Sequence, residues 1–479
     1  MLNKIVIDSK VKIFEALRII DEIGTKILFV TNNSNFVGAL ADSDIRRFLL
    51  SGGDIKDIVE SAINKNAKFI TPLNNLEDVL AIFESGVEYV PRLDELGRIV
   101  EILVANENKF YPISEPDLSG RERDYLISAF DSGWISSTGP FVTLFEEKFN
   151  SYLNFGHSVS VCNGTQAIAL ALSAMGIKSG DEVIVPDLTF GATANAVIQI
   201  GAVPIIAEVD ELTWNISIKS LKSLISSSTK AIIPVHLYGQ PCNMTEIQDL
   251  ASKNNLLVIE DAAEALGTFY GGRHVGYGSE AVIFSFFGNK TISTGEGGMV
   301  VFKNESDAAR AKVIRSHGFS PNKRYWHESW GTNMRMTNLQ AAIGVAQLER
   351  VSSLVNKKIE IAKLYMLSIT KYLQDKITFP IENYGNINSH WLSAMLLPKG
   401  ISVEKIQAIL ESKHIETRRF FYPLHSQPAF SKFKSEGLLN ASQLFERGIC
   451  LPSSTKLTKL DIEHISREFA EAVRMELTK

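Results

Sequence analysis

The 479-residue chain has few cysteines, no long apolar run and no apolar leader. Its three cysteines, Cys162, Cys242 and Cys450, are far apart and form neither a CxxC pair nor a metal-binding spacing. We therefore predict no disulfide framework and no metal site, but reduced thiols in a cytoplasmic protein. No apolar run approaches the roughly 20 residues of a membrane helix, and no signal peptide is recognisable, so no membrane association is expected.

The chain also lacks a strong imbalance of charge. Its 49 Lys and Arg residues stand against 54 Asp and Glu residues, for a formal net charge of −5. Because no basic region stands out, nucleic acid is not an expected partner. Hydrophobic residues make up 45% and charged residues 22%, the mixture of a soluble globular protein, and the length indicates more than one domain.

Residues 1–108 contain short helical and β-like stretches whose order recurs in weaker form. The expected elements are helices over 13–23, 45–50 and 76–85 and strands over 26–30, 36–40, 87–92 and 98–104. A repeat of about 50 to 60 residues predicts two similar α+β units packed face to face, since neither buries its apolar face alone.

This region resembles a tandem CBS pair, the Bateman module. In the stretch 38–47, Asp44 matches the acidic residue with which that family grips a ribose, although Ala41 replaces the usual Thr or Ser. The second copy, at 101–107, has lost most of the pattern. The resemblance implies a regulatory nucleotide at Asp44. The alternatives are that Asp44 only caps a helix, or that the module is a spacer or dimerisation element that binds nothing.

Beyond residue 108, short apolar runs alternate with helical stretches. Expected strands lie at 159–161, 183–186, 203–206, 231–235 and 256–259, and expected helices at 167–175, 359–373, 403–412 and 461–477. The alternation predicts an α/β fold, with a mostly parallel sheet covered by helices in a large domain over 109–350. The later helical periodicity predicts a smaller C-terminal domain over 351–479.

Two polar segments follow expected strands of this sheet. Gly164 and Thr165 come after the first strand and open a helix, where free backbone N–H groups bind anions. Asp261 follows another strand, at the edge where open α/β sheets bind ligands. A carboxylate there is able to keep a pyridinium nitrogen protonated, as pyridoxal phosphate (PLP) requires. Taken singly, each segment is equally compatible with a capped helix or a solvated turn.

One lysine stands out by its surroundings. Lys290 follows the aromatic run 284–287 and precedes the glycine-rich loop 295–298. An isolated lysine is usually a surface residue, but apolar flanking sequence favours a desolvated amine with a lowered pKa, which is a good nucleophile. Ser285, five residues earlier, is a candidate hydrogen-bond donor to a phosphate.

Ordered matches over about residues 111–475 resemble the DegT/DnrJ/EryC1/StrS family of sugar aminotransferases, which has the type I, aspartate-aminotransferase-like fold. The matching segments are 133–140, 180–186, 234–241, 295–299 and 336–344. The resemblance implies a PLP-dependent aminotransferase that works as a homodimer with shared active sites.

The resemblance also implies a role for each candidate residue. Lys290 would bind the cofactor covalently and move the proton of the reaction, and Asp261 would pair with the ring nitrogen. The other implied cofactor contacts are Gly164, Thr165 and Ser285 at the phosphate, Phe190 on the ring, Glu264 near the 3-hydroxyl group, and Asn333 at the phosphate of the neighbouring subunit. Many members carry Gln or His where this chain has Glu264.

Within that family, segments 286–292, 324–327 and 421–425 look most like perosamine synthases, which convert GDP-4-keto-6-deoxy-D-mannose to GDP-perosamine with L-glutamate as the amino donor. The implied sugar-binding residues are Trp326, His327, Tyr422 and His425, each of which would otherwise pack between lobes.

Three other functions are weighed against this one. The first is amination of a UDP- or dTDP-linked 4-keto sugar, and the second is the dehydration of a sister group that has histidine in place of Lys290. The third is a nucleotide-sensing regulatory protein that uses the aminotransferase fold as a scaffold. Retention of Lys290 disfavours the second and third.

Overall fold

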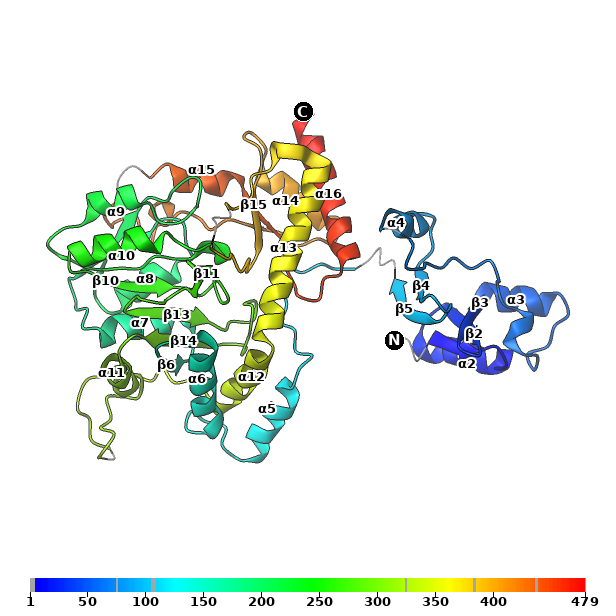
Figure 1. Ribbon diagram of the computed structural model, residues 1–479, viewed down its shortest axis with the longest axis horizontal. Helices are drawn as coiled ribbons and strands as arrows, with labels where there is room; N and C mark the ends of the chain where they lie inside the picture. The colour runs from blue at the N-terminus through cyan, green and yellow to red at the C-terminus, as the bar shows by residue number, and fades with distance from the viewer. Residues whose placement is uncertain are drawn as a thin grey trace. The chain divides into compact units, whose positions relative to one another are not determined.

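The computed structural model describes residues 5–74, 76–104, 109–323, 325–381, 385–435 and 438–478. The chain forms two compact units, Met1–Lys109 and Phe110–Lys479 (Figure 1). Each unit has its own sheets and its own apolar core, so each is described by itself.

The first unit contains a three-stranded sheet and a separate two-stranded hairpin. The sheet has the order β1-β2-β3, with β2 parallel to β1 and antiparallel to β3, while β4 pairs with β5. Its elements are β1 (Val6–Asp8), α2 (Ile13–Ile23), β2 (Ile27–Asn32), β3 (Asn35–Ala41), α3 (Asp42–Leu50), a short 3-10 helix η1 (Val59–Ser61), α4 (Leu76–Glu84), β4 (Tyr89–Leu93) and β5 (Ile99–Val104). The helices and strands expected from the sequence are confirmed, with ends within three residues of those predicted.

Local sequence explains where helix α2 lies and where it ends. Ile13 and Ala16, three positions apart, are both buried against the core that Leu28 and Val30 of β2 help to form. The helix ends at Gly24, whose φ of +66° is a left-handed conformation that glycine adopts without steric cost.

The second unit is built on a seven-stranded sheet with the order β6-β14-β13-β10-β9-β7-β8. Every neighbouring pair is parallel except those made by β14, which runs antiparallel to both β13 and β6. The predicted mostly parallel sheet is therefore confirmed. Its strands are β6 (His157–Val161), β7 (Glu182–Pro186), β8 (Val203–Ala207), β9 (Thr229–Ile232), β10 (Leu257–Asp261), β13 (Ala281–Ser285) and β14 (Gly298–Phe302), and a small hairpin joins β11 (Phe269–Tyr270) to β12 (Arg273–His274).

Helices cover both faces of this sheet, because successive side chains of a buried strand point to opposite faces. In β13, Ile283 packs with one core cluster, together with α7, α8 and α11, whereas Phe284 packs with another, together with α6, α12 and the start of α13. The helices of the large lobe are α5 (Glu122–Asp131), α6 (Pro140–Leu153), α7 (Gly164–Ala174), α8 (Ala192–Gln199), α9 (Ile218–Leu224), α10 (Met244–Lys253), α11 (Glu305–Arg315) and α12 (Asn338–Glu349).

A smaller lobe surrounds the three-stranded antiparallel sheet β15-β17-β16. Its elements are α13 (Val351–Leu373), β15 (Ser393–Leu396), α14 (Val403–Glu411), β16 (Arg418–Arg419), α15 (Asn440–Arg447), β17 (Gly448–Leu451) and α16 (Lys459–Leu477). The long helix α13 runs from α12 of the large lobe to this smaller lobe (Figure 1). The helices predicted over 359–373, 403–412 and 461–477 are confirmed.

The boundary between the lobes differs from the prediction in one place. Tyr111, expected in the large domain, is buried in the core of the smaller lobe and pairs in parallel with Ile415. The start of the second unit therefore packs in the core of the smaller lobe, although the strands of the large sheet follow it in the chain. Local sequence patterns do not predict such a long-range contact. Among the described residues, no helix has both the length and the apolar character needed to cross a membrane.

Candidate active site

The carboxyl ends of the parallel strands meet at one edge of the large sheet, where the chain encloses a cavity of about 540 Å³. Five residues that the sequence marked in separate segments border it: Gly164, Thr165, Asp261, Ser285 and Lys290. Strand topology explains their meeting, because parallel neighbours end at the same edge of a sheet.

The N-terminus of α7 forms one wall of the cavity. Asn163 caps the helix by accepting a hydrogen bond from the backbone N–H of Gln166 at 2.9 Å. By their position in the first turn, the N–H groups of Gly164 and Thr165 have no carbonyl partner within the helix. A Cβ on Gly164 would lie 3.0 Å from the Cβ of Ser285, so glycine allows this close approach. The two segments together form a cradle suited to a phosphate.

Asp261 is the last residue of β10 and is buried. Its Oδ2 accepts a hydrogen bond from the Thr193 hydroxyl at 2.8 Å, and its Oδ1 accepts one from the Ala263 N–H at 3.1 Å. Burial nevertheless raises the pKa of this carboxyl group, and these hydrogen bonds and the Lys290 charge oppose that rise only in part. A cation placed against the carboxylate would complete its charge balance, as a protonated pyridine nitrogen does.

Lys290 lies in the loop between β13 and β14, and its backbone N–H donates to the carbonyl of Phe287 at 2.9 Å. Its Nζ lies 3.6 Å from the ring centroid of Trp391 and 3.7 Å from Oε1 of Glu264. Burial lowers the pKa of the amine, while Glu264 and Asp261 act in the opposite direction. The structure thus holds a desolvated amine, the nucleophile that the sequence analysis expected.

Glu264 and aromatic side chains form the wall beside this amine. Oε2 of Glu264 accepts a hydrogen bond from the Tyr238 N–H at 2.9 Å, and burial raises the pKa of the acid. The Tyr238 ring stacks against Trp391 and Phe421 with interplanar angles of 17° and 15°. Phe190 borders the cavity with its ring exposed and its centroid 5.8 Å from that of Phe421, so its face remains accessible to a ligand.

Several residues of the site have no signal in the local sequence. Trp391 and Arg418 come from the smaller lobe and border the same cavity as Lys290. Thr193, which donates to Asp261, lies in α8, 68 residues away along the chain. Only long-range packing brings these side chains to the strand ends.

The structure does not bring Trp326, His327 or Asn333 to the cavity of their own chain. Nδ1 of His327 lies 2.7 Å from the carbonyl oxygen of His317, and Oδ1 of Asn333 accepts a hydrogen bond from Nε of Arg335 at 3.0 Å. The segment that follows α11 extends away from the sheet (Figure 1). Their predicted roles therefore stay predictions, and Arg324, next to them in the motif, lies outside the described residues.

Tyr422 and His425 also lie apart from the cavity lining. The Tyr422 ring packs on Phe445 with centroids 4.3 Å apart. Nδ1 of His425 lies 2.6 Å from Oδ2 of Asp187, which also accepts the His425 backbone N–H at Oδ1. Burial raises the pKa of Asp187, and the backbone N–H and the imidazole of His425 oppose this rise in part. The alternative of packing between lobes describes His425 well in this chain.

In the first unit, Asp44 borders a hollow of about 560 Å³ together with Phe48, Asn64 and Lys65. Its Oδ2 accepts a hydrogen bond from the backbone N–H of Ala41 at 3.0 Å, and its Oδ1 lies 3.5 Å from Nη1 of Arg47. Asp44 therefore caps the start of α3, as one alternative predicted, and also faces a space large enough for a ligand.

The cavity around Lys290 fits PLP in all four of its chemical requirements. It combines an amine for the aldehyde, a buried carboxylate for the ring nitrogen, a helix start for the phosphate and an exposed aromatic ring for the pyridine face. No cluster of three or more potential metal ligands occurs among the described residues.

Comparison with known proteins agrees with this chemistry. The sequence model of the DegT/DnrJ/EryC1/StrS aminotransferase family matches residues 116–470. The GDP-perosamine synthase of Caulobacter vibrioides is 42% identical over 355 residues, which are 74% of this chain and 95% of that protein. The GDP-perosamine synthase of Vibrio cholerae is 41% identical over 345 residues, 71% of this chain and 93% of the relative.

A solved structure shows the same fold. PseC of Helicobacter pylori, an aminotransferase involved in the biosynthesis of pseudoaminic acid, superposes with a TM-score of 0.72 at 26% identity. The match covers 77% of this chain and all of the Helicobacter chain.

Proposed function

Because the chain belongs to the DegT/DnrJ/EryC1/StrS aminotransferase family and is a PLP-dependent aminotransferase, we propose that it makes GDP-perosamine. In this reaction L-glutamate donates the amino group and the C4 ketone of GDP-4-keto-6-deoxy-D-mannose receives it. The observation that carries the amino-transfer chemistry is the Lys290 amine, whose side chain is only 13% exposed, in one cavity with the buried Asp261 carboxylate. The choice of sugar is supported by three relatives named GDP-perosamine synthase, 41% to 42% identical to this chain.

Each candidate residue has a task at the cofactor. PLP, when bound, supplies an electron sink for the carbanion at the reacting carbon. Asp261 would hold the ring nitrogen protonated, and the α7 start with Ser285 would hold the phosphate. Phe190 would cover the ring face. These tasks need only groups that already border the cavity.

Lys290 moves the proton that amino transfer requires. Burial lowers the pKa of its amine, which makes the neutral form more accessible, so Nζ is able to take a proton from the donor's Cα and to give it up later. Glu264, 3.7 Å from that nitrogen, keeps the amine oriented and stabilises its protonated form. The indole of Trp391, with its ring centroid 3.6 Å from the same nitrogen, limits access of water to it.

The substrate assay separates the three candidate nucleotides. We expect amination with L-glutamate to be at least about tenfold more efficient for the GDP-linked 4-keto-6-deoxyhexose than for UDP- or dTDP-linked ones, the effect of one charge-assisted contact. Faster turnover of a UDP- or dTDP-linked sugar would instead support the alternative carrier. A bound-PLP absorbance band that borohydride bleaches distinguishes any of these enzymes from a nucleotide-sensing scaffold.

A homodimer with shared sites explains the position of the segment after α11. Trp326, His327 and Asn333 do not border their own chain's cavity, and we assign them to the cavity of a second copy. Mixing Lys290→Ala protein with Asn333→Ala protein should restore activity, because one site of each mixed dimer carries neither change. Random exchange predicts recovery to about a quarter of the wild-type rate. No recovery after subunit exchange would contradict the assignment.

We further propose that the first unit is a tandem CBS module that binds a regulatory nucleotide. Asp44 lies at the edge of a hollow that also presents Phe48, Asn64 and Lys65, a mixture suited to a ribose, a base and a phosphate. Calorimetry with AMP, ATP, GDP and GTP tests this proposal. Heat that disappears in Asp44→Asn supports it, whereas no heat with any nucleotide supports the assembly element.

A further inference from the structure

A second buried lysine lies behind the site. Lys358 is in α13, and only 2% of its surface is exposed. Its Nζ donates hydrogen bonds to the backbone carbonyl of Trp391 at 3.0 Å and to the hydroxyl of Ser114 at 3.4 Å. Among the described residues no carboxylate forms an ion pair with it, and it does not border the cavity.

These contacts connect Lys358 to two neighbours of Lys290: Asn289, which precedes it in the chain, and Trp391, whose ring contacts its amine. The indole Nε1 of Trp391 donates to the carbonyl of Asn289 at 2.8 Å, and the Ser114 hydroxyl donates to the same carbonyl at 3.2 Å. Asn289 precedes Lys290 in the chain, and the Trp391 ring lies 3.6 Å from the Lys290 nitrogen. Lys358 therefore fixes both the backbone that carries the reactive amine and the ring against which the amine lies.

Stability alone does not account for a lysine at this position. Burial lowers the pKa of Lys358 to about 7, and the like charge of Lys290 contributes in the same direction. An apolar side chain of similar length would fill the same space without the cost of burying an amine. We therefore expect Lys358 to orient neighbouring groups and not to stabilise the fold.

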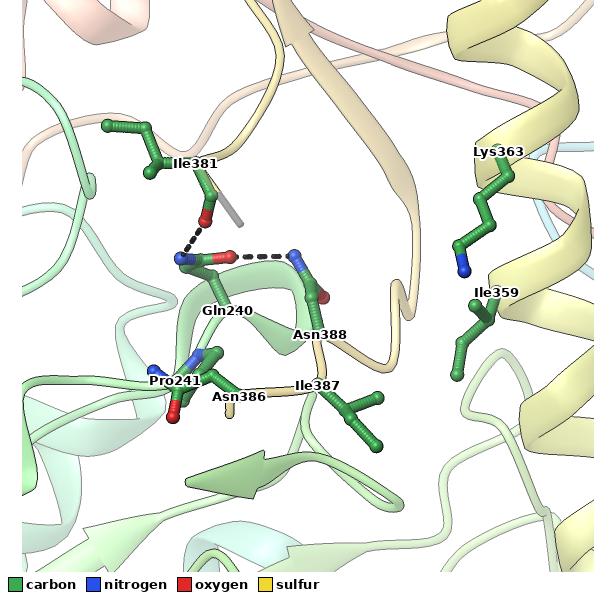
Figure 2. A pocket seen from close by; sticks show the side chains of 8 residues that line it. All are labelled: Gln240, Pro241, Ile359, Lys363, Ile381, Asn386, Ile387 and Asn388. Atoms are coloured by element: carbon green, nitrogen blue, oxygen red, sulfur yellow. Dashed lines mark hydrogen bonds between the residues drawn. The ribbon is translucent and has the colours of Figure 1, made fainter. Parts of the chain in front are cut away.

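The segment that carries Trp391 is also held at its other end (Figure 2). Nε2 of Gln240 donates to the carbonyl of Ile381 at 2.8 Å, and Nδ2 of Asn388 donates to Oε1 of Gln240 at 2.9 Å. Ile359 and Lys363 of α13 line the opposite side of a small cavity of about 90 Å³ there. The segment is thus held at residue 388 by amide hydrogen bonds and at residue 391 by Lys358. These two contacts restrict tilting of the indole.

We propose that Lys358 is a positioning residue of the aminotransferase, which holds the Lys290 amine in its reactive orientation through Trp391 and Asn289. The inference rests on the proposed role of Lys290 as the reacting amine. Lys358 lies behind the cavity lining, 68 positions further along the chain than Lys290, and is not among the residues expected to contact the cofactor.

The test compares Lys358→Met with Lys357→Met in the full-length protein. Lys357 lies on the same helix and pairs with Glu360 at 3.0 Å, so it is a matched control outside the network. In the PLP-loaded enzyme we expect Lys358→Met to lower kcat about tenfold with KM changed less than about twofold, because a displaced reactive group loses rate and not substrate affinity. An unchanged kcat in Lys358→Met would overturn the proposal.

A second readout does not depend on turnover or on the identity of the sugar. In cofactor-free protein, competitive acylation followed by mass spectrometry gives the pH midpoint at which Lys290 reacts. Loss of the Lys358 contacts loosens the indole and admits water to the Lys290 amine, so the midpoint should move upward in Lys358→Met and stay constant in Lys357→Met. A midpoint that stays constant in both variants would also overturn the proposal, even if the sugar substrate had been wrongly assigned.

Two further variants separate positioning from a general loss of structure. If Lys358 acts in part through the indole, Lys358→Met should cost only about threefold in a Trp391→Phe background, since the Ser114 bridge to Asn289 is then the route that remains. A full additive loss there would contradict the route through Trp391. Should Lys358→Met not fold, Ser114→Ala removes only the bridge to Asn289, and we expect a decrease in kcat of about threefold, the value of one neutral hydrogen bond.

Discussion

The two hollows of this protein have similar volumes but hold their charges in different ways. The cavity of the second unit measures about 540 Å³ and that of the first about 560 Å³. Around the first, Asp44, whose side chain is 14% exposed, caps a helix and pairs with Arg47, whose side chain is 77% exposed to solvent. Around the second, Asp261 and Glu264 are buried and the Lys290 side chain is 13% exposed. Burial raises the pKa of both acids and lowers the pKa of the amine, which favours the neutral form of each group.

This difference separates a site built for chemistry from one suited at most to binding. Keeping ionisable groups away from water costs free energy, and a fold retains them where their shifted proton affinities are used. The Asp44 carboxylate, held by a helix N–H and by an exposed arginine, is suited to recognising a ligand. Four variants test the contrast, in order of decreasing expected effect.

Removal of the reactive amine should have the largest effect. Lys290→Ala is expected to lower amination by at least about 10⁴-fold, because the proton transfer and the covalent attachment are both lost. The measurement is the amination rate with L-glutamate, together with the absorbance band that borohydride bleaches. Robust amination by this variant would refute the role of Lys290 and would remove the proposed difference between the two cavities.

Neutralising the buried acid should lower activity and raise the stability of the cofactor-free protein. Asp261→Asn is expected to lower kcat about 10²- to 10³-fold, the cost of removing one preorganised electrostatic contact. Burial raises the pKa of Asp261 in the folded state above its ordinary 3.8, so its ionisation weakens the cofactor-free fold as pH rises.

The same variant should therefore stabilise the cofactor-free protein by about 1 kcal/mol at neutral pH, the cost of burying a poorly compensated group. The gain should disappear below the ordinary pKa of 3.8, where the acid is protonated in both states. Thermal unfolding of both proteins across pH gives the comparison. A destabilised variant at neutral pH would mean that the acid is already compensated by its surroundings.

Loss of one phosphate contact should weaken the cofactor without abolishing the chemistry. Ser285→Ala is expected to raise the dissociation constant of PLP about tenfold, as for one hydrogen bond to a charged group. Spectroscopic titration of cofactor-free protein measures it. The control is Ser252→Ala on the exposed face of α10, which should leave the constant unchanged. Equal affinities in the two variants would remove Ser285 from the phosphate cradle.

The smallest effect is expected in the first unit. Asp44→Asn should change the amination rate less than about twofold in the absence of nucleotide, since Asp44 does not border the Lys290 cavity and an ion pair with an exposed partner contributes little. It should, however, remove any response of the enzyme to an added nucleotide. A large loss of basal activity would show that the first unit contributes to catalysis directly, and the contrast between the two hollows would then be wrong.

Much of the site could be predicted because its residues follow strands. The segments that contain Gly164, Asp261 and Ser285 each come after a buried apolar run, and a parallel sheet brings such ends to one edge. The residues assigned to sugar binding behave differently. Neither Trp326 nor Asn333 lines the cavity of its own chain. The family resemblance implies the neighbouring subunit for Asn333, whereas it does not indicate which subunit's cavity Trp326 serves.

The sequence alone determined the order of helices and strands, the parallel sheet and the residue types at its edge, because these follow from periodicity and from local turn chemistry. Only the tertiary structure decided that Tyr111 belongs to the C-terminal core, that Trp391 covers the reactive amine and that Lys358 supports that ring. These contacts join segments far apart in the chain, and their energies depend on burial, which no local pattern encodes. Proximity along the chain predicts which groups are available, whereas packing sets how far from water each of them lies.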